Sequence, residues 1–356
     1  SWFLEKRRYL IDELGIDGFK TDGGEFVWGS DVVASNGLSG RSLRNAYPDA
    51  YAQAYYDFIN ADGQERVTFS RAGGSSMQTH PLCWIGDQLS DEKAFKSAII
   101  AAQSASMSGI PFVAWDIAGF SGDVPTTELY CRSAAQAAFS PVMQLHSETS
   151  GDPSPSAART PWNMAERKGS DTCLEVYKYY ANLRMNLLPY IYSEAAYSSE
   201  SGEPLMRSMA YEFPEDSEAA EYEYQYMLGR SLLVAPVTEI SSGRVEVYLP
   251  EGEWYGFFDG ELYEPGTHMF ECELDEIPVF VRAGSVIPLN TVDGKLGSYV
   301  GNDTESYSDL EFWSFADGSE YDWFDYVSGE QYTLKLTDEY TKLAVPYEYS
   351  VRCFAA

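Results

Sequence analysis

The sequence predicts an α/β barrel followed by all-β sandwich domains, and three observations lead to this prediction. Over residues 1–200, short apolar runs alternate with helical stretches, which is typical of a parallel sheet. Each apolar run ends in polar or glycine-rich residues, as the strands of a (β/α)8 barrel do at the face that carries function. After about residue 225 the pattern changes to short alternating strands with Pro, Gly and Asp turns, which indicates a β-sandwich.

The elements of residues 1–200 follow from their periodicity. The expected helices span residues 1–14, 50–61, 92–107, 128–138 and 174–196. The expected strands span residues 18–21, 66–70, 111–114 and 141–145, with a further short strand or loop that ends at 84–87. An open, doubly wound sheet is the alternative architecture, but no glycine-rich phosphate-binding fingerprint follows any of these strands.

The remainder of the chain is predicted to be all-β. Strands are expected at residues 231–237, 244–249, 254–258, 278–282 and 285–288, and a further set of short strands begins near residue 291. The predicted domains are therefore a barrel segment at 1–200, a proximal β-sandwich at 201–290 and the start of a further β module at 291–356.

Charge and composition restrict the partners of the protein. The 356 residues carry a formal net charge of −31, and so strong a negative field argues against nucleic acid and anionic membranes as partners. A neutral ligand such as a sugar fits this charge, and 15% of the residues are aromatic. No apolar run is long enough to cross a membrane.

No metal site or cofactor is predicted. The three histidines lie far apart, and the five cysteines are scattered without a CxxC pair, which indicates reduced thiols rather than disulfides or zinc ligands. The chain opens on Ser1 within what looks like a helix, so we expect it to be a piece of a longer protein.

Asp22 is the first candidate catalytic residue. It ends a short apolar run and is followed at once by Gly23 and Gly24, so a carboxylate would face a cleft while the backbone turns away. The structural alternative is an ordinary Asp-Gly turn.

Asp87 is the second candidate. It follows the apolar segment 81–86, and a carboxyl in partly dry surroundings tends to keep a proton and can act as an acid. One ionised and one protonated carboxyl are what glycoside hydrolysis requires. The alternative is that Asp87 caps the helix that begins near Glu92.

Seven segments together resemble glycoside hydrolase family 31, in order and over roughly residues 10–290. They are Phe69-Ser70-Arg71-Ala72-Gly73-Gly74 with Trp84-Ile85-Gly86-Asp87, Gly109-Ile110-Pro111-Phe112-Val113 with Asp116-Ile117-Ala118-Gly119-Phe120, the stretch 136–147, Leu187-Leu188-Pro189-Tyr190-Ile191-Tyr192, and the stretches 227–237, 248–254 and 278–285.

The resemblance implies a role for each matching residue. Asp22 would be the nucleophile that forms a covalent glycosyl ester, and Asp87 the acid and base, so that the α configuration is retained. Arg71 would bind a sugar hydroxyl and the region of the nucleophile.

Four further residues would line the subsite of the reacting sugar. Asp116 and His146 would bind hydroxyl groups, and Trp84 and Phe120 would form apolar walls. As structural residues, these side chains would be satisfied strand-end polar groups and core aromatics instead.

Two departures from the family pattern bear on the sugar. The family's α-glucosidases carry Trp and Met where this chain has Lys20 and Gly23, and the segment 19–25 looks more like the α-xylosidase branch. Lys20 would contact the ligand or pair with Glu25, and Gly23 would enlarge the pocket. The resemblance thus implies xylosides first, then glucosides, with galactose, N-acetylgalactosamine or sulfoquinovose as alternatives.

The leading prediction is a retaining exo-α-glycosidase, or a transglycosylase of the same family, that acts on an oligosaccharide or glycoside. By the resemblance, this chain supplies only about the fourth to eighth barrel strands, so the missing first half is an expected partner. An oligomer is compatible with the sequence. The alternative function is a carbohydrate-binding fragment without activity of its own. Acidic charge, reduced thiols and the α-xylosidase-like segment slightly favour a microbial cytoplasm.

Overall fold

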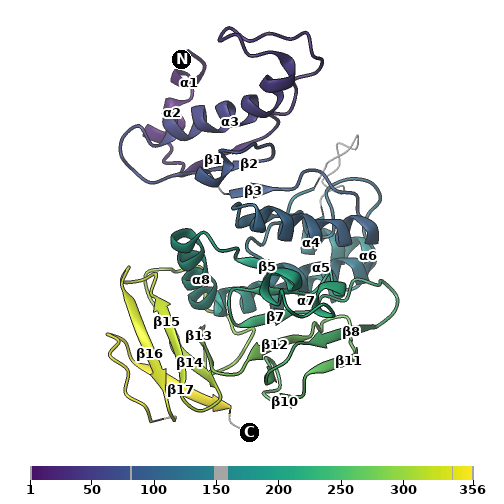
Figure 1. The fold of residues 1–356 in the computed structure, drawn as a ribbon, viewed down its shortest axis with the longest axis vertical. Coiled ribbons are helices and arrows are strands. Elements are labelled where there is room, and N and C mark those ends of the chain that lie inside the picture. Colours follow the sequence, from purple (N-terminus) through teal and green to yellow (C-terminus); the bar gives the residue numbers. More distant parts are fainter. Residues whose placement is uncertain (1, 81, 148–158, 339, 355–356) are drawn as a thin grey trace.

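The computed structural model describes residues 2–80, 82–147, 159–338 and 340–354. The N-terminal helices and the first strands form one end of the molecule, and the antiparallel sheets form the other (Figure 1). Among the described residues, no helix is both long and apolar enough to span a membrane.

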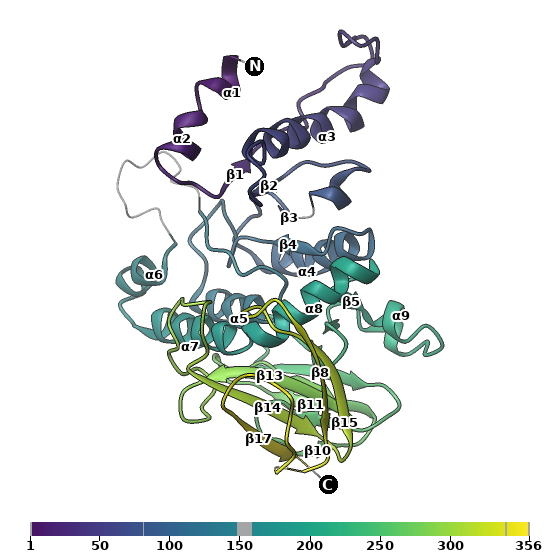
Figure 2. The same cartoon turned by 90° about the vertical axis from the view of Figure 1, so that its left-hand side faces the viewer.

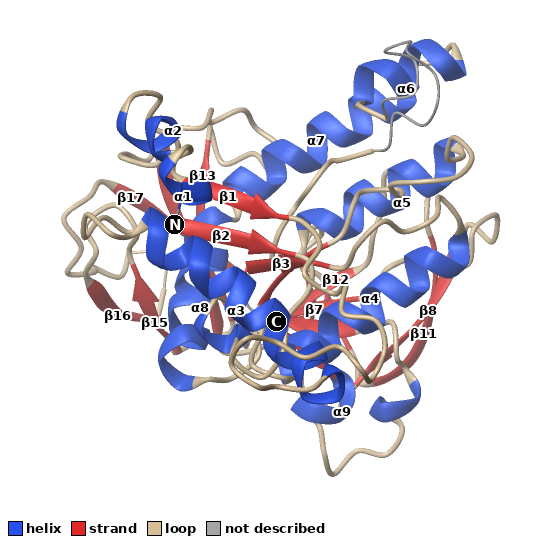
Figure 3. Cartoon of the chain, turned by 90° about the horizontal axis from the view of Figure 1, so that it is seen from above, coloured by secondary structure: helices blue, strands red, loops and turns tan. Residues whose placement is uncertain are grey.

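A four-stranded parallel sheet carries the N-terminal half. Its strands lie in the order β1 (Gly18–Thr21), β2 (Val67–Ser70), β3 (Leu82–Trp84) and β4 (Phe112–Ala114). The first three run side by side in the same direction in Figure 3. Because all three pairings are parallel, the residues that follow these strands meet at one edge of the sheet.

The helices largely confirm the prediction for this half. They are α1 (Trp2–Glu5), α2 (Arg8–Asp12), α3 (Gly40–Ile59), α4 (Glu92–Met107), α5 (Thr127–Ala138), α6 (Pro161–Lys168), α7 (Thr172–Asn186) and α8 (Leu188–Ser201). A short 3-10 turn, Met77–Thr79, precedes β3.

Three helical predictions were wrong in extent. The helix expected at 1–14 is two short helices, and α3 begins ten residues before the expected start at residue 50. Pro48 lies inside α3, so this proline does not mark the start of the helix. The helix expected at 174–196 is divided at Leu187, because Pro189 cannot donate the hydrogen bond that would continue it.

One strand prediction was also wrong. Residues 141–145 form no regular strand, and a single parallel bridge joins Asp116 to Gln144. Pro141 has no N–H to contribute to a ladder. The backbone contact with the segment after β4 is this bridge, with the bond from Ile117 N to Gln144 O (3.1 Å).

The proximal β unit consists of two antiparallel sheets. The larger has the strand order β10-β9-β12-β7-β6-β5, and β8 pairs with β11 in the smaller. The bounds are β5 (Met206–Ser208), β6 (Tyr226–Leu228), β7 (Leu232–Val234), β8 (Arg244–Leu249), β9 (Trp254–Gly256), β10 (Leu262–Tyr263), β11 (Gly266–Glu271) and β12 (Val279–Arg282). The helix α9 (Met209–Glu212) and the 3-10 turn Ala219–Glu221 connect β5 to β6. Leu233, Val247 and Trp254 pack between the two sheets.

The last strands form two further sheets. Strand β13 (Ser285–Thr291) pairs antiparallel with β14 (Asp309–Phe315), which pairs parallel with β17 (Tyr349–Phe354). Strands β15 (Ser319–Phe324) and β16 (Gln331–Leu336) pair with each other. Helix α8 lies against β13 and β15 (Figure 2). The domain limits at residues 200 and 290 remain predictions.

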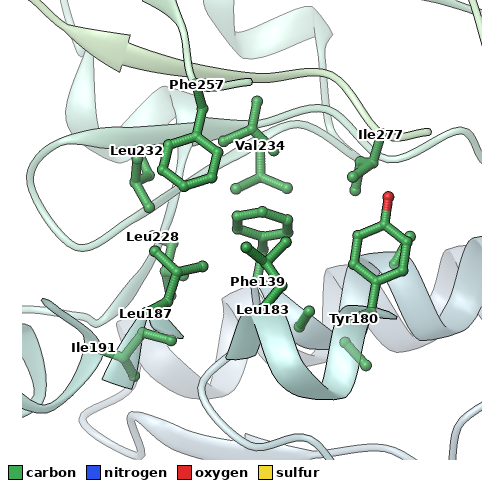
Figure 4. Packing of buried hydrophobic residues seen from close by; sticks show 14 of the residues in the cluster. Phe139, Tyr180, Leu183, Leu187, Ile191, Leu228, Leu232, Val234, Phe257 and Ile277 are labelled. Atoms are coloured by element: carbon green, nitrogen blue, oxygen red, sulfur yellow. The ribbon is translucent and has the colours of Figure 1, made fainter. Parts of the chain in front are cut away.

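A single apolar core joins the helices to the β region. Phe139 from the end of α5, Leu183 from α7 and Leu228 from β6 point toward Phe257 in Figure 4. The same core includes Phe312 of β14. The β sheets therefore support the helices that lie beneath the parallel sheet.

Candidate active site

The site lies at the edge of the parallel sheet where β1, β2 and β3 end. Thr21 at the end of β1 is buried, and its hydroxyl lies 2.6 Å from the hydroxyl of Ser70 at the end of β2. Asp22 and Arg71, the next residues along each strand, are thereby set side by side.

Two backbone features orient Asp22. Gly23 has φ +82° and Gly24 φ +98°, a region that L side chains rarely adopt, so the chain turns away directly after the acid. The N–H of Gly23 donates to Asp22 Oδ1 at 2.9 Å, and the hydroxyl of Tyr51 donates to the carbonyl of Asp22 at 3.1 Å. These contacts fix the backbone around Asp22 and hold its carboxylate at the end of β1.

Arg71 brings the two candidate carboxylates together. Its Nη1 lies 2.9 Å from Asp22 Oδ1 and 3.5 Å from Asp87 Oδ2. Because a single nitrogen reaches both oxygens, the two carboxyls face each other across one guanidinium. A separation near 5 Å is typical of retaining glycosidases, and this geometry is compatible with it.

Glu25 is a third carboxylate partner of Arg71, and the sequence did not reveal it as such. Its Oε1 accepts from Arg71 Nη2 at 2.5 Å. One of the two alternatives predicted for Lys20 is an ion pair with Glu25. The structure contradicts that pairing, because Lys20 Nζ lies over the ring of Trp84, 4.1 Å from its centroid.

The surroundings of Asp87 differ from the prediction. The side chain is 48% exposed rather than partly dry, because Gly86 (φ +90°) turns the chain outward after the buried Trp84. Asp87 does not cap α4 either. The side chain of Asp91 does so, by accepting from Ala94 N at 2.7 Å.

Asp116 is the most perturbed acid of the site. It is fully buried and accepts a hydrogen bond from Gln144, while its Oδ2 has no hydrogen-bond partner among the described residues. Burial raises the pKa of Asp116 to about 6, and the hydrogen bond from Gln144 and the charge of Lys20 oppose that shift. Gln144 was not predicted as a site residue, although its segment belongs to the motif that carries His146.

His146 and Phe120 lie together. Their ring centroids are 5.0 Å apart, and His146 is exposed. Partial desolvation and the charge of Lys20 lower the pKa of His146, while Asp87 and Asp22 act in the opposite direction, so this imidazole lies within electrostatic reach of both carboxylates.

Trp84 is less accessible than a pocket wall would be. It is 2% exposed and lies against Phe69, with ring centroids 5.2 Å apart, and beneath the ammonium group of Lys20. In this structure the exposed side chain of Lys20 covers the buried ring of Trp84.

Gly23 does not open the pocket in the way that the sequence suggested. A Cβ atom built on Gly23 would lie 2.8 Å from Cε2 of Phe26, so the Phe26 ring already occupies that space. The sequence did not predict this position of the Phe26 ring beside Gly23.

Two further observations concern the rest of the described chain. No group of three or more His, Cys, Asp or Glu side chains within the described ranges is arranged to hold a metal ion. A hollow of about 540 Å³ lies between α7 and the proximal β unit, lined among others by Tyr179, Phe258 and Tyr263, and it contains neither Asp22 nor Asp87.

Comparison with known proteins places the chain in a family. Residues 1–194 match the glycosyl hydrolases family 31 TIM-barrel domain, and residues 202–287 match the glycosyl hydrolase family 31 C-terminal domain. These two matches confirm the predicted fold class, a TIM barrel followed by a C-terminal β domain.

Three similar proteins cover different shares of the chain. An isomaltosyltransferase of Sporosarcina globispora is 43% identical over 96% of this chain and 31% of its own length. A 1,3-alpha-isomaltosidase of Kribbella flavida is 42% identical over 80% of this chain and 39% of its own. The crystal structure of a cycloalternan-forming enzyme from Listeria monocytogenes, in complex with a pentasaccharide substrate, has a TM-score of 0.91 at 46% identity and covers 95% of this chain and 32% of that one.

The chain spans about a third of the length of these relatives. Its two family domains together with the acids set around Arg71 lead to one conclusion: this chain belongs to family 31 of the glycosyl hydrolases.

Proposed function

We propose that this protein is a retaining enzyme that cleaves a terminal α-glucosidic linkage and passes the released glycosyl unit through a covalent intermediate on Asp22. The contact of Arg71 Nη1 with both Asp22 and Asp87 is the observation that carries the proposal. A nucleophile and an acid must reach the same glycosidic bond, and this guanidinium sets them facing each other.

The chemistry proceeds in two displacements. The carboxylate of Asp22 attacks the anomeric carbon as the bond to the leaving oxygen breaks, and Asp87 gives that oxygen its proton. Asp87 then takes the proton of an incoming hydroxyl, whose oxygen displaces Asp22 from the anomeric carbon. Two inversions retain the α configuration.

Other residues of the site would hold the sugar. The unpartnered Oδ2 of Asp116 would accept from a sugar hydroxyl, since no protein group among the described residues satisfies it. His146 and Lys20 would donate to hydroxyls, and Phe120 would cover an apolar face of the ring. No step requires a metal or a cofactor.

An isomaltosyl unit is the glycosyl group that we favour. The transferase and the hydrolase reported above are both named for isomaltosyl substrates, at 43% and 42% identity. The predicted order, with xylosides first, gains no support from these relatives, so xylosides and simple glucosides are alternative substrates, and galactosides, N-acetylgalactosaminides and sulfoquinovosides are more remote ones.

Transfer to a sugar acceptor is favoured over hydrolysis. The isomaltosyltransferase matches 96% of this chain and the isomaltosidase 80%, at nearly equal identity. The cycloalternan-forming enzyme likewise covers 95%. The more extensive likeness is thus with proteins named for bond formation.

The test uses the complete protein with aryl α-xyloside, α-glucoside and α-isomaltoside donors, each with and without isomaltose as acceptor. We expect the isomaltoside to react fastest and to give transfer products. Asp22→Asn should abolish release from every donor. Asp87→Ala should lose hydrolysis of poor leaving groups, and added azide should restore turnover as a glycosyl azide, because azide attacks the intermediate without a base.

Asp91→Ala is the matched control, since Asp91 is a carboxylate four residues from Asp87 that caps α4. It should cost about 1 kcal/mol of stability and leave turnover within threefold. Release from all donors by Asp22→Asn at the wild-type rate would refute the proposed nucleophile. Preference for the xyloside would refute the isomaltosyl assignment alone.

A further inference from the structure

The loop that follows β1 presents an aromatic ring directly beside the proposed nucleophile. The Cε2 atom of Phe26 lies 2.8 Å from the position that a Cβ on Gly23 would take. The N–H of that same Gly23 donates to Asp22 Oδ1. The Phe26 ring therefore packs on the backbone that orients the nucleophile.

Phe26 does not behave as a core residue. It is 62% exposed, and none of the three apolar clusters found within the described ranges includes it. Its exposed ring lies beside Gly23, and its neighbour Glu25 is paired with Arg71. The ring is therefore an apolar surface next to the carboxylates set around Arg71, where a ligand could cover it.

The charge of the surroundings indicates what would cover the ring. Asp22, Glu25 and Asp87 are close by, so an anionic ligand is disfavoured, and these acids accept hydrogen bonds from hydroxyl groups. A sugar has both hydroxyl groups and an apolar C–H face that packs on an aromatic ring.

We propose that Phe26 is a specificity-determining residue that stacks on the sugar ring adjoining the one attacked by Asp22. This rests on the proposed function. Gly23 has no side chain because the stacking ring needs its Cβ space. The adjoining sugar belongs either to the donor, as the second glucose of an isomaltosyl unit, or to the acceptor, and the chemistry of recognition is the same.

The experiment compares Phe26→Ala, Phe26→Leu and Phe26→Trp in the complete protein. Leu restores apolar volume against Gly23 without an aromatic face, whereas Trp keeps the face. The matched control is Tyr299→Ala, which removes an aromatic ring that is 78% exposed in the C-terminal β region.

The first arm measures the donor side with α-isomaltosyl fluoride and α-glucosyl fluoride, because fluoride is not a sugar and leaves the acceptor side empty in the first step. The readout is the ratio of kcat/KM for the two donors. If the ring stacks on the donor, Ala and Leu should lower this ratio at least tenfold, while Trp and the Tyr299 control should keep it within threefold.

The second arm measures the acceptor side as the ratio of transfer to hydrolysis at fixed isomaltose concentration. If the ring stacks on the acceptor, the same two variants should lower this ratio at least tenfold. Unchanged ratios in both arms, or a Leu variant that matches the wild type, would overturn the proposal, since either result would mean that the ring only packs against Gly23.

Failure of the proposed function is recognised separately. If the wild type turns over neither fluoride, binding of isomaltotriose to Asp22→Asn by calorimetry replaces both arms. Phe26→Ala in that background should weaken binding at least fivefold and Phe26→Trp should not. Equal affinities would refute the stacking role whatever the reaction is.

Discussion

Arg71 shows how far single residues were predictable. The sequence pointed to Arg71, Asp22 and Asp87 because each follows a short apolar run, and the structure brings all three together. It did not point to Glu25 as a partner of Arg71, since ion pairing is decided by side-chain direction, which two glycines before Glu25 leave undetermined from sequence.

Glu25→Gln tests that missed partner. The amide keeps the volume of Glu25 but removes the negative charge 2.5 Å from Arg71 Nη2, so Arg71 should be held less firmly between the two catalytic carboxylates. A charge-assisted hydrogen bond contributes about 1.5–3 kcal/mol, so kcat/KM should fall roughly ten- to hundredfold.

A structural role alone would lower stability without moving the dependence of kcat/KM on pH. We expect the pH dependence of kcat/KM to shift as well, because Arg71 contacts the carboxyl groups of both Asp22 and Asp87, whose charges change during the proposed reaction. Glu65→Gln, at an exposed position outside the site, is the control. A change of less than twofold for Glu25→Gln would show that Arg71 is fixed by the other contacts.

Asp116 predicts a pH dependence of stability. Its pKa is about 6 in the folded protein against 3.8 for an ordinary Asp, because burial disfavours the charge. The folded state therefore binds the proton more tightly than the unfolded state. The corresponding stabilisation is complete below pH 3.8 and is lost as the pH rises toward and through 6.

The free energy of unfolding of the wild type, measured relative to that of Asp116→Asn, should decrease by up to roughly 3 kcal/mol as the pH rises from 3.5 to 7. Thermal unfolding of both proteins across this range measures it. Asp123→Asn, an exposed neighbour, should show no such trend. A constant difference between wild type and Asp116→Asn would contradict the assignment.

At the scale of elements, α8 is the junction of three parts of the molecule. The side chain of Glu194 is 1% exposed. It accepts a hydrogen bond at 2.7 Å from Nη2 of Arg230, which lies in the turn between β6 and β7. It accepts another at 2.7 Å from the hydroxyl of Tyr321 in β15. Gly229 is required beside it, because a Cβ there would lie 2.5 Å from Glu194 Cγ. The helix was predicted, but its role as a connector was not.

Glu194→Gln should destabilise the protein by roughly 3 kcal/mol, because it leaves the partly buried guanidinium of Arg230 without its counter-charge. Guanidinium unfolding measures the loss. A double-mutant cycle with Arg230→Gln should return a coupling above 1 kcal/mol.

The control is Glu203→Gln, which breaks an ion pair with Arg207 in which the acid is 38% exposed, and which should cost less than about 1 kcal/mol. If the two substitutions cost the same, burial at the junction is not what gives Glu194 its effect.

At the scale of the whole molecule, one apolar core extends from α5 to the last strands. Phe312 and Phe315 of β14 and Trp323 of β15 are almost fully buried in it. Strand β13 crosses the proposed domain limit at residue 290 and pairs with β14 along its length.

Removal of residues 291–356 should therefore not yield a stable remainder. All residues of β13 are buried in the intact protein. Deleting β14 would leave what remains of β13 without its pairing partner and would expose its apolar side chains to solvent. We expect the soluble yield to collapse, or the Tm to fall by more than about 10 °C with new binding of a hydrophobic dye. A truncated protein that melts within a few degrees of the parent would establish 291–356 as an independent domain.

The sequence by itself determined the class of elements, the positions of β1, β8 and α4, and the family, because periodicity and short motifs depend on neighbours along the chain. Only the tertiary structure decided which carboxylates share Arg71, that Asp87 is exposed, and that Phe26 fills the space beside Gly23. These depend on side chains up to 65 positions apart meeting across parallel strands, and no local pattern specifies how such side chains turn.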